Sequence, residues 1–267
     1  EQKTNDAERR KRMELQTEKI PAIELRGITK TFGKVIANRN VSLVAYRGEI
    51  LSILGENGSG KTTFIKLLCR MYDPTEGEIL LNGVDIRKYQ YSQYLKFFSV
   101  VFQDFKIFAF TLGENVGSSA NYDAARATEC LNKAGFGDRL ATMEKGLDTF
   151  LYSAYDKNGV NVSGGEAQKI AIARTLYKNA PFIVLDEPTA ALDPLAEAEI
   201  YSKFNDIAQG KTAVYISHRL SSCKFCDEIA VFSDGEVVQY GTHESLLADK
   251  KGKYFKLWNA QAQYYTD

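Results

Sequence analysis

The amino-acid sequence predicts an α/β fold, and three observations support this prediction. From residue 22 onward, short segments rich in β-forming residues alternate with segments of helical pattern. Several of the short segments are apolar almost throughout, which is typical of parallel strands that are buried on both faces. Apolar residues make up 44% of the 267 residues, which is enough to form a sizeable core.

The expected strands differ in their apolar pattern. Residues 22–25 and 41–44 alternate between apolar and polar side chains, which predicts strands at the edge of a sheet. Residues 122–179 are mainly helical in pattern and are expected to form an insertion between two strands. Three further runs are apolar almost throughout and are predicted to be buried parallel strands: residues 50–54, 182–185 and 213–216.

The charge balance argues against some classes of partner. The chain has 34 basic and 34 acidic residues, and a formal net charge of zero does not suggest an extended nucleic-acid-binding surface. No apolar run approaches the roughly 18 residues of a membrane-spanning helix, and the charged first residues do not resemble a secretory signal. Residues 1–20 are expected to be a solvated linker or lead-in to the domain.

The four cysteines do not form a zinc pattern. Only Cys223 and Cys226 are close together, and the chain has just two histidines. We therefore expect reduced structural cysteines, as in a cytosolic protein. A redox role for the Cys223–Cys226 pair is the less favoured alternative.

A phosphate-binding loop is predicted between the strand at residues 50–54 and a helix beginning near Thr62. Its glycines allow tight turns that direct N–H groups at phosphate oxygens, and the helix adds the positive end of its dipole. Lys61 can reach the β- and γ-phosphates, and the Thr62 hydroxyl can join a Mg²⁺ shell. A chance match would occur in roughly one such chain in a hundred. The loop and the residue after it are Gly55, Glu56, Asn57, Gly58, Ser59, Gly60, Lys61, Thr62 and Thr63.

Two carboxylates follow the predicted strand at residues 182–185. Ligands of open α/β sheets bind at the carboxyl ends of the strands. Asp186 at that position can orient a Mg²⁺ ion, and Glu187 is suited to polarise an attacking water molecule. A solvated strand end is the alternative, and the phosphate loop elsewhere in the chain makes it the less favoured one.

A second glycine-rich segment precedes a helix expected at residues 167–177. Ser163 and Glu166 have the spacing of a capping box, so the simplest interpretation is a well-capped helix. Gly164 and Gly165 would also expose N–H groups that suit an anion. This second phosphate-binding element becomes meaningful if two subunits share each nucleotide.

These motifs, in this order, resemble those of the nucleotide-binding domain of the ATP-binding cassette (ABC) family. Residues 163–165 look like the family's signature motif, and the resemblance extends over residues 22–265. Four further residues match functional positions of the family: Gln103 in the glutamine loop, Asp193 in the segment after the carboxylates, His218 in the switch-histidine segment, and Phe32, where an aromatic ring stacks on adenine.

The resemblance implies a fold and its cofactors. The fold is a phosphate-loop (RecA-like) core sheet with an antiparallel β subdomain and a helical insertion subdomain at about residues 105–179. These parts belong to one nucleotide-binding domain at residues 21–267. The implied cofactors are ATP, held by the loop and by Ser163, Gly164, Gly165 and Glu166, and Mg²⁺, held by Thr62, Gln103 and Asp186.

The resemblance also implies a composite active site. Two subunits would lie head to tail around two ATP molecules, so that Ser163 and Gly165 of one subunit face the nucleotide bound by the other. Asp193 would cross the interface between the subunits. The residues implied in catalysis are Glu187 as the group that activates water, His218 as its orienting partner, and Gln103, which would contact Mg²⁺ and the water.

The sequence departs from the family pattern at two places. The signature commonly reads Leu-Ser-Gly-Gly-Gln, whereas this chain has Val162 and Glu166. A glutamate can close the capping box as a glutamine does, but its charge can weaken or tune the docking of the γ-phosphate. Phe32 stands where the family often has tyrosine, and stacking needs only a π face.

Several stretches resemble exporters of the family, which couple this domain to a membrane domain. The implied partners are a transmembrane domain and a second nucleotide-binding domain in a homo- or heterodimer, at the cytoplasmic face of the membrane. An excised domain is favoured over a separately made subunit. The aromatic and apolar cluster after Gln103 is expected to be partly core and partly a docking groove for the membrane domain; it comprises Phe105, Ile107, Phe108 and Phe110.

Two other functions remain as alternatives. A soluble ABC ATPase acting on nucleic acid or ribosomes usually has two such domains or long basic or coiled-coil insertions, which this sequence lacks. A phosphate-loop kinase would give no reason for the segment at residues 163–165 or for His218. The sequence does not indicate which substrate is transported.

Overall fold

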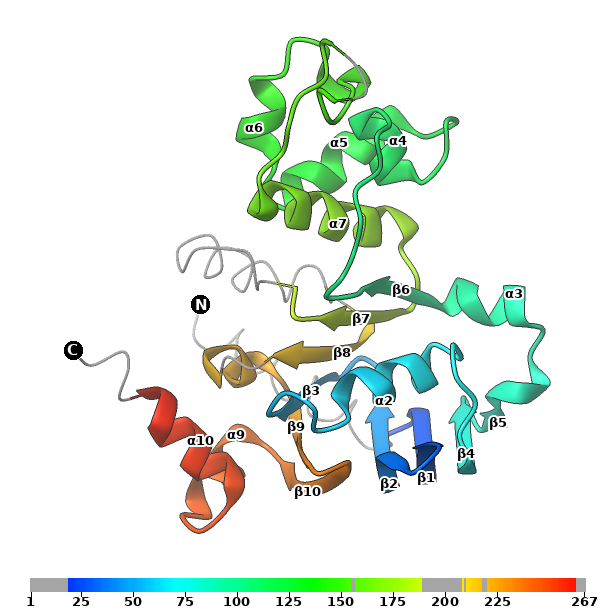
Figure 1. The fold of residues 1–267 in the computed structure, drawn as a ribbon, viewed down its shortest axis with the longest axis vertical. Coiled ribbons are helices and arrows are strands. Elements are labelled where there is room, and N and C mark those ends of the chain that lie inside the picture. Colours follow the sequence, from blue (N-terminus) through cyan, green and yellow to red (C-terminus); the bar gives the residue numbers. More distant parts are fainter. Residues whose placement is uncertain (1–18, 155–156, 189–207, 209, 218–219, 263–267) are drawn as a thin grey trace, which may run out of the picture.

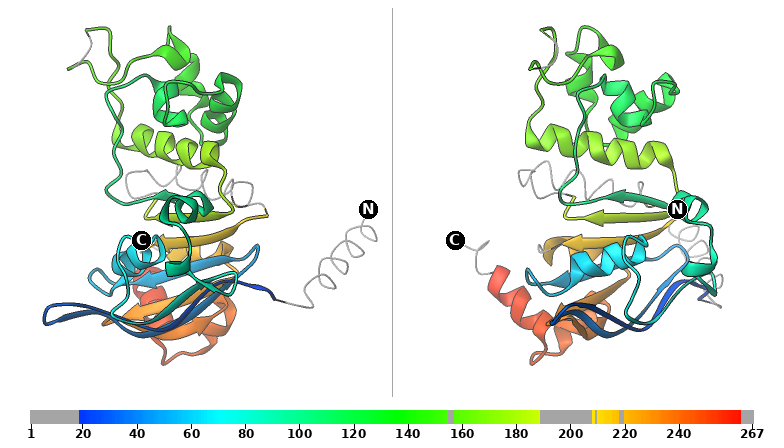
Figure 2. Two further views of the ribbon diagram at one scale, coloured as in Figure 1. Left: turned by 90° about the vertical axis from the view of Figure 1, so that its right-hand side faces the viewer. Right: turned by 45° about the vertical axis from the view of Figure 1, so that its right-hand side comes forward.

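The computed structural model describes residues 19–154, 157–188, 208, 210–217 and 220–262. These residues form a four-stranded antiparallel sheet, a six-stranded sheet that is mostly parallel, and helices around both. In Figure 1 the antiparallel strands lie at the bottom, the parallel strands cross the middle, and the helices between residues 112 and 178 lie at the top. Both views of Figure 2 likewise show these helices above the two sheets. This arrangement confirms the predicted α/β class with its antiparallel β part and its helical part.

The antiparallel sheet corrects one strand prediction. Its first strand pairs with a neighbour on both sides, so the prediction that residues 22–25 lie at a sheet edge is wrong, whereas residues 41–44 do belong to an edge strand. Alternation of apolar residues shows that one face is buried, and it does not show how many neighbours a strand has. In the order β2-β1-β4-β5, the strands are β1 (Pro21–Phe32), β2 (Val35–Tyr46), β4 (Glu76–Leu81) and β5 (Val84–Asp85).

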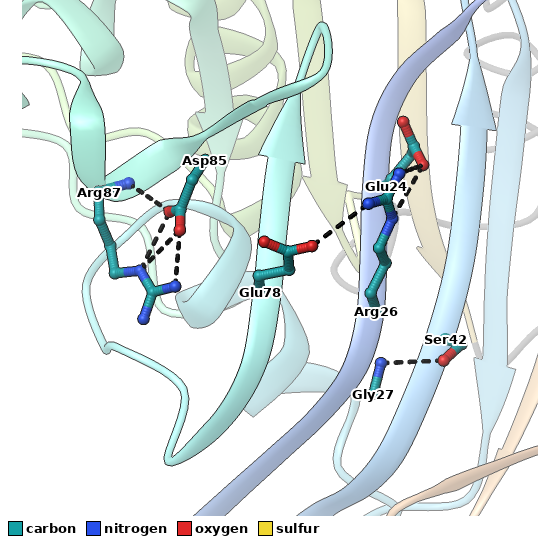
Figure 3. A network of polar contacts seen from close by, with 7 residues as sticks. All are labelled: Glu24, Arg26, Gly27, Ser42, Glu78, Asp85 and Arg87. Carbon is teal, nitrogen blue, oxygen red and sulfur yellow. Dashed lines mark hydrogen bonds and ion pairs between the residues drawn. The ribbon is translucent and has the colours of Figure 1, made fainter.

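Charged side chains connect the strands of this sheet on its exposed side (Figure 3). The Arg26 guanidinium donates to Glu24 Oε2 at 2.7 Å and to Glu78 Oε1 at 3.3 Å, which links β1 to β4. Nearby, Arg87 pairs with Asp85 at 2.6 Å, and this hydrogen bond lowers the pKa of the Asp85 carboxyl. Exposed ion pairs contribute at most about 1 kcal/mol each. The apolar face therefore stabilises the sheet more than this network does.

The six-stranded sheet contains the buried strands that the sequence predicts. Every residue of β3, β7 and β8 is buried, which confirms the predictions for residues 50–54, 182–185 and 213–216. All strands but the edge strand β10 run parallel, so the carboxyl ends of the parallel strands meet at one edge. In the order β10-β9-β3-β8-β7-β6, the strands are β10 (Glu236–Gly241), β9 (Glu228–Ser233), β3 (Ile50–Gly55), β8 (Thr212–Ser217), β7 (Phe182–Asp186) and β6 (Phe98–Val101).

The helical insertion lies between β6 and β7. Its apolar residues share one core cluster with the sheet, including Ile170 from the longest helix and Leu185 from β7. The Tyr122 side chain packs so tightly that a Cβ at Gly113 would lie 2.1 Å from its ring, and a Cβ at Gly117 would lie 2.4 Å from its Cβ. The helices are α4 (Leu112–Gly117), α5 (Ala124–Lys133), α6 (Gly137–Ala141) and α7 (Gly164–Lys178).

The remaining elements surround the two sheets. No helix in the described part of the chain is long and apolar enough to cross a membrane. None of the four cysteines, all of which lie in the described residues, forms a disulfide bond, and Cys226 is partly exposed whereas the other three are buried. These elements are α2 (Lys61–Leu68), η1 (Ile86–Lys88), α3 (Tyr91–Tyr94), η2 (Leu95–Phe97), η3 (Gly146–Asp148), η4 (Leu220–Phe225), α9 (His243–Ala248) and α10 (Lys253–Ala262).

Candidate functional site

The predicted phosphate loop connects β3 to α2. Gly58 and Gly60 have φ angles of 80° and 99°, which glycine adopts far more readily than other residues. A Cβ at Gly60 would also lie 2.4 Å from the carbonyl oxygen of Ala37, so a side chain does not fit there. Gly60 is the N-cap residue of α2 and supplies no side-chain hydrogen bond to the first turn. The loop thus leaves the N–H groups at the start of α2 without a side-chain cap.

Neighbouring segments hold this loop in place. The Asn38 side chain on β2 is buried and its Nδ2 donates to the carbonyl oxygen of Gly60 at 3.2 Å. The N–H of Gly235, in the turn between β9 and β10, donates to the carbonyl oxygen of Ser59 at 3.1 Å. The sequence did not identify Asn38, and only the polar residue at a buried strand position could have pointed to it. The loop is therefore braced from two sides.

Lys61 lies inside the loop. Its side chain is buried, and its Nζ donates to the carbonyl oxygens of Gly55 and Glu56. Burial lowers the pKa of the Lys61 ammonium, and the negative charges of Glu187, Asp186 and Glu56 oppose this shift. Thr62, the next residue, is exposed in the first turn of α2. A buried cation beside free N–H groups suits an anionic ligand.

Asp186 ends strand β7 as a buried acid. Only 3% of the residue is exposed, and its Oδ2 has no hydrogen-bond partner among the described residues. Burial, followed by the charge of Glu187, raises the pKa of the Asp186 carboxyl to about 6, and Lys61 opposes the shift. A buried carboxylate with an unpartnered oxygen needs a proton or a cation.

Glu187 follows in a strained backbone conformation. Its φ angle is 50°, in the left-handed region, which is uncommon for a residue with a side chain. Its N–H donates to the carbonyl oxygen of Ile216 at 3.1 Å, and its own carbonyl oxygen accepts from Gln168 Nε2 at 3.1 Å. Strained residues held this firmly are concentrated at functional sites. Gln168, a buried polar side chain on α7, is not among the residues predicted from the sequence.

Gln103 lies beside Glu187 because the two residues follow neighbouring strands. Its Nε2 donates to Glu187 Oε2 at 3.0 Å. Gln103 follows β6 and Glu187 follows β7, and the two strands run parallel in adjacent positions. The structure thus brings together Lys61, Asp186, Glu187 and Gln103 at the carboxyl edge of the sheet, through the contacts and charge interactions described above.

The second glycine-rich segment forms the start of α7. The helix begins at Gly164, so the prediction that it begins at residue 167 is wrong by one turn. Both hydrogen bonds of the predicted capping box are present: Ser163 N–H donates to Glu166 Oε2 at 2.7 Å, and Glu166 N–H donates to Ser163 Oγ at 3.2 Å. Because Ser163 and Glu166 close the capping box with each other, the helix begins directly after Ser163. The two glycines between them therefore lie in its first turn.

Phe32 ends β1 with a ring that is 43% exposed. The ring meets that of Tyr72 edge to face, with centroids 5.2 Å apart, and Lys30 Nζ lies 5.1 Å from the Phe32 centroid. The exposed ring remains available to a planar ligand. The other two predicted site residues, Asp193 and His218, lie outside the described residues.

The cluster after Gln103 divides as the sequence predicts. Ile107 is buried and Phe105 packs against the core, whereas Phe108 and Phe110 are 53% and 54% exposed. The two exposed rings line a cavity of about 320 Å³ together with Asn115 on α4 and Arg174 on α7. Two exposed aromatic rings thus border a hollow in the surface.

Comparisons with known proteins show which chains this one is similar to. The model of the ABC transporter family matches residues 38–190. The chain is 37% identical over 245 residues to an ATP-dependent lipid A-core flippase of Burkholderia orbicola (strain AU 1054), covering 90% of this chain and 40% of the flippase. The Escherichia coli (strain K12) flippase is likewise 37% identical over 243 residues, covering 90% of this chain and 41% of that protein.

A solved structure gives the same result for the fold. A bacterial Atm1-family ABC exporter with ATP bound superposes with a TM-score of 0.83 at 33% identity, covering 91% of this chain and 42% of the exporter. The chain thus spans about 40% of the length of the relatives it matches. It belongs to the ABC transporter family, as a nucleotide-binding domain of the exporter type.

Proposed function

We propose that this chain binds ATP with Mg²⁺ and hydrolyses it to ADP and phosphate, as the motor of a membrane exporter. One observation carries the proposal. The buried Lys61 of the phosphate loop interacts electrostatically with the carboxylates of Asp186 and Glu187, and Glu187 has a strained backbone and accepts a hydrogen bond from Gln103. Family membership supports ATP as the nucleotide. The predicted ligands of ATP are the loop residues, Thr63 and Phe32.

The phosphate loop would bind the β- and γ-phosphates. The uncapped N–H groups at the start of α2 offer donors and the positive end of the helix dipole. The Lys61 ammonium now donates to two main-chain carbonyl oxygens, and we propose that phosphate oxygens take its bonds when ATP binds. The ring of Phe32 would stack on the adenine.

The residues present fit a magnesium ion. Mg²⁺ prefers oxygen ligands and keeps several water and phosphate ligands, so it needs few groups from the protein. Asp186 offers a buried oxygen without a partner among the described residues, Thr62 an exposed residue with a hydroxyl, and Gln103 a side-chain amide beside Glu187. The absence of a cluster of three acidic, cysteine or histidine ligands in the described part of the chain agrees with such a sparse site. When bound, the ion would neutralise charge on the phosphates.

Glu187 is the proposed base. Its carboxylate would accept a proton from a water molecule whose oxygen bonds to the γ-phosphorus, while the bond from that phosphorus to the bridging oxygen breaks and ADP leaves with that oxygen. Gln103 holds one carboxylate oxygen of Glu187, and Gln168 and Ile216 hold its backbone. His218 is proposed to contact the γ-phosphate and to orient Glu187.

The active site is proposed to be shared by two subunits. Ser163, Gly164 and Gly165 at the start of α7 would face the γ-phosphate of ATP bound to the other subunit, and Asp193 would cross the interface. The single described chain supplies two glycine-rich helix N-termini but one phosphate loop. A second copy, or a related domain, would complete each site.

A membrane domain is the second proposed partner. The relatives named above are a lipid A-core flippase and an ABC exporter, and each is more than twice as long as this chain. The cavity lined by Phe108 and Phe110 would receive a segment of that domain on the cytoplasmic face of the membrane. In this proposal residues 1–20 are the linker and residues 21–267 the nucleotide-binding domain. We expect membrane-spanning segments to be encoded with the chain or beside it.

Replacing Glu187 with glutamine tests the proposal. We expect Glu187→Gln to bind ATP but to lose hydrolysis by at least about 100-fold, since the base is removed. The variant should accumulate as an ATP-bound dimer, which gel filtration with Mg²⁺ and ATP would show as a doubled mass. Glu129→Gln, at an exposed position on α5, is the matched control and should hydrolyse normally. Retained hydrolysis, or a persistent monomer with bound ATP, would contradict the base or the shared site respectively.

A further inference from the structure

A basic side chain stands beside the acidic residue of the signature segment. The Glu166 carboxylate uses one oxygen, Oε2, to close the capping box with Ser163. Its other oxygen, Oε1, lies 2.9 Å from Nε of Arg139 on α6. The N–H of that nitrogen is not aimed at the oxygen, so the contact is an ion pair without a linear hydrogen bond. Both oxygens of Glu166 are thus engaged, each by a different partner.

Helix α6 is firmly attached to α7. Phe136, the residue before α6, is buried in the core of the helical insertion, and Leu140 packs against the same core. Lys169 on α7 donates from Nζ to the carbonyl oxygen of Gly135 at 2.9 Å. Arg139 itself donates from Nη1 to Thr142 Oγ1 at 3.3 Å. The arginine is therefore fixed in position next to the first turn of α7.

The charge of Glu166 matters because of where it lies. A carboxylate in the first turn stabilises its own helix by interacting with the positive end of the dipole. The same carboxylate weakens the attraction of that helix end for an external anion, and ATP brings several negative charges. An arginine paired with the carboxylate cancels its charge and leaves the hydrogen bonds of the capping box intact. With 38% and 27% of their side chains exposed, Arg139 and Glu166 stabilise the fold little by pairing.

We propose that Arg139 is a positioning residue that makes an acidic signature segment compatible with a nucleotide. It holds Glu166 in the capping geometry and neutralises it, so that the start of α7 attracts the γ-phosphate of ATP on the facing subunit. This inference rests on the proposed two-subunit site. It explains how Glu166 can occupy a position where the resemblance suggests glutamine.

A cycle of substitutions tests this inference in the Glu187→Gln chain with Mg²⁺ and ATP. Sedimentation velocity over a range of protein concentrations gives the dissociation constant of the dimer. We expect Arg139→Met to weaken the dimer about tenfold, because both composite sites acquire an uncompensated negative charge. Adding Glu166→Gln should restore the dimer, and Arg139→Lys should stay within about twofold of the parent because it keeps the charge. Lys133→Met, which removes an exposed cation paired with Glu129 on α5, is the matched control.

The outcomes separate the possible roles of Arg139. Equal loss with glutamate or glutamine at position 166 would show a merely structural role and overturn the inference, as would no loss in Arg139→Met. Midpoints of thermal unfolding without nucleotide check the fold of each variant; rescue by Glu166→Gln would support the electrostatic role even if Arg139→Met lowers the midpoint. If the parent Glu187→Gln chain stays monomeric with ATP, the two-subunit site itself is contradicted, and this inference falls with it.

Discussion

Two helices of this chain begin at glycine-rich segments, and their first turns are built in opposite ways. At α2 the N-cap is Gly60, with left-handed backbone, no side-chain hydrogen bond and no acidic residue in the first turn. At α7 the N-cap is Ser163, with extended backbone and a complete capping box that Glu166 closes. The charged groups differ as well, since Asp186 beside α2 has an oxygen without a partner among the described residues, whereas both oxygens of Glu166 are engaged.

The two glycine-rich helix starts therefore differ in whether they need a ligand for their stability. The start of α2 is incomplete by itself, because a bound ligand would stabilise its buried charges and give hydrogen-bond acceptors to its uncapped N–H groups. The start of α7 is complete by itself, because its capping box is closed without a ligand. We therefore expect changes at α2 to affect ligand binding most, and changes at the cap of α7 to affect the stability of its helix.

The largest expected effect comes from removing the buried cation at α2. We predict that Lys61→Ala weakens the binding of ATP by at least about 100-fold, because charge-assisted bonds to phosphate are among the strongest in proteins. Isothermal titration calorimetry measures the affinity. Lys66→Ala, on the last turn of the same helix, should change it little. Unchanged ATP binding in Lys61→Ala would contradict the view that the start of α2, unlike that of α7, is built for a ligand.

The unpartnered acid should give an effect of intermediate size. Because the pKa of Asp186 is raised to about 6 in the folded chain, the folded state holds a proton more tightly than the unfolded state does. Without nucleotide and metal, the free energy of unfolding should therefore fall as pH rises from about 4 to about 6, and then level off. Asp186→Asn should lack this fall and be more stable than the parent by about 2 to 3 kcal/mol at pH 8.

Urea unfolding of both chains at pH 4 and pH 8, in the presence of a chelator, measures this difference. The two chains should differ much less at pH 4, where most of the folded parent already carries the proton. An equal difference at both pH values would show that the effect of the asparagine is one of packing and not of charge.

The smallest expected effect concerns the cap of α7. We predict that Ser163→Ala lowers the free energy of unfolding by about 1 kcal/mol, because the N–H of Glu166 loses its acceptor. Urea unfolding without nucleotide measures it. Thr111→Ala removes the equivalent cap of α4, where Glu114 closes the box, and should cost a similar amount. If Ser163→Ala is neutral while Thr111→Ala is not, the cap of α7 does not stabilise its helix as the contrast requires.

Much of the fold could be predicted from the sequence because burial leaves a periodic signal. Strands β3, β7 and β8 are buried throughout and mostly apolar because helices or a second sheet cover both faces, and all three could be predicted from the sequence. The neighbours of β1 could not be predicted in this way. They depend on β4, which starts 44 residues after Phe32 at Glu76, and pairing over such a distance leaves no local pattern.

The residues of the candidate site also differ in whether the sequence predicts them. Lys61, Asp186 and Glu187 stand in short motifs whose local chemistry is visible in the sequence. Gln168, Asn38 and Arg139 act through contacts with other elements, namely with Glu187, Gly60 and Glu166 respectively. None of them belongs to a motif that was predicted from the sequence, and their partners lie on other elements, so sequence patterns did not single them out.

The sequence by itself determined the class of the fold, the phosphate loop, the capped helix and the two acids, because each depends on residues close together in the chain. The tertiary structure decided the pairing of β1, the strained backbone of Glu187, its bond to Gln103 and the ion pair of Arg139 with Glu166. The physical reason is that these features arise where separate elements pack together. Burial, charge pairing and backbone strain at such places depend on what the rest of the chain brings alongside.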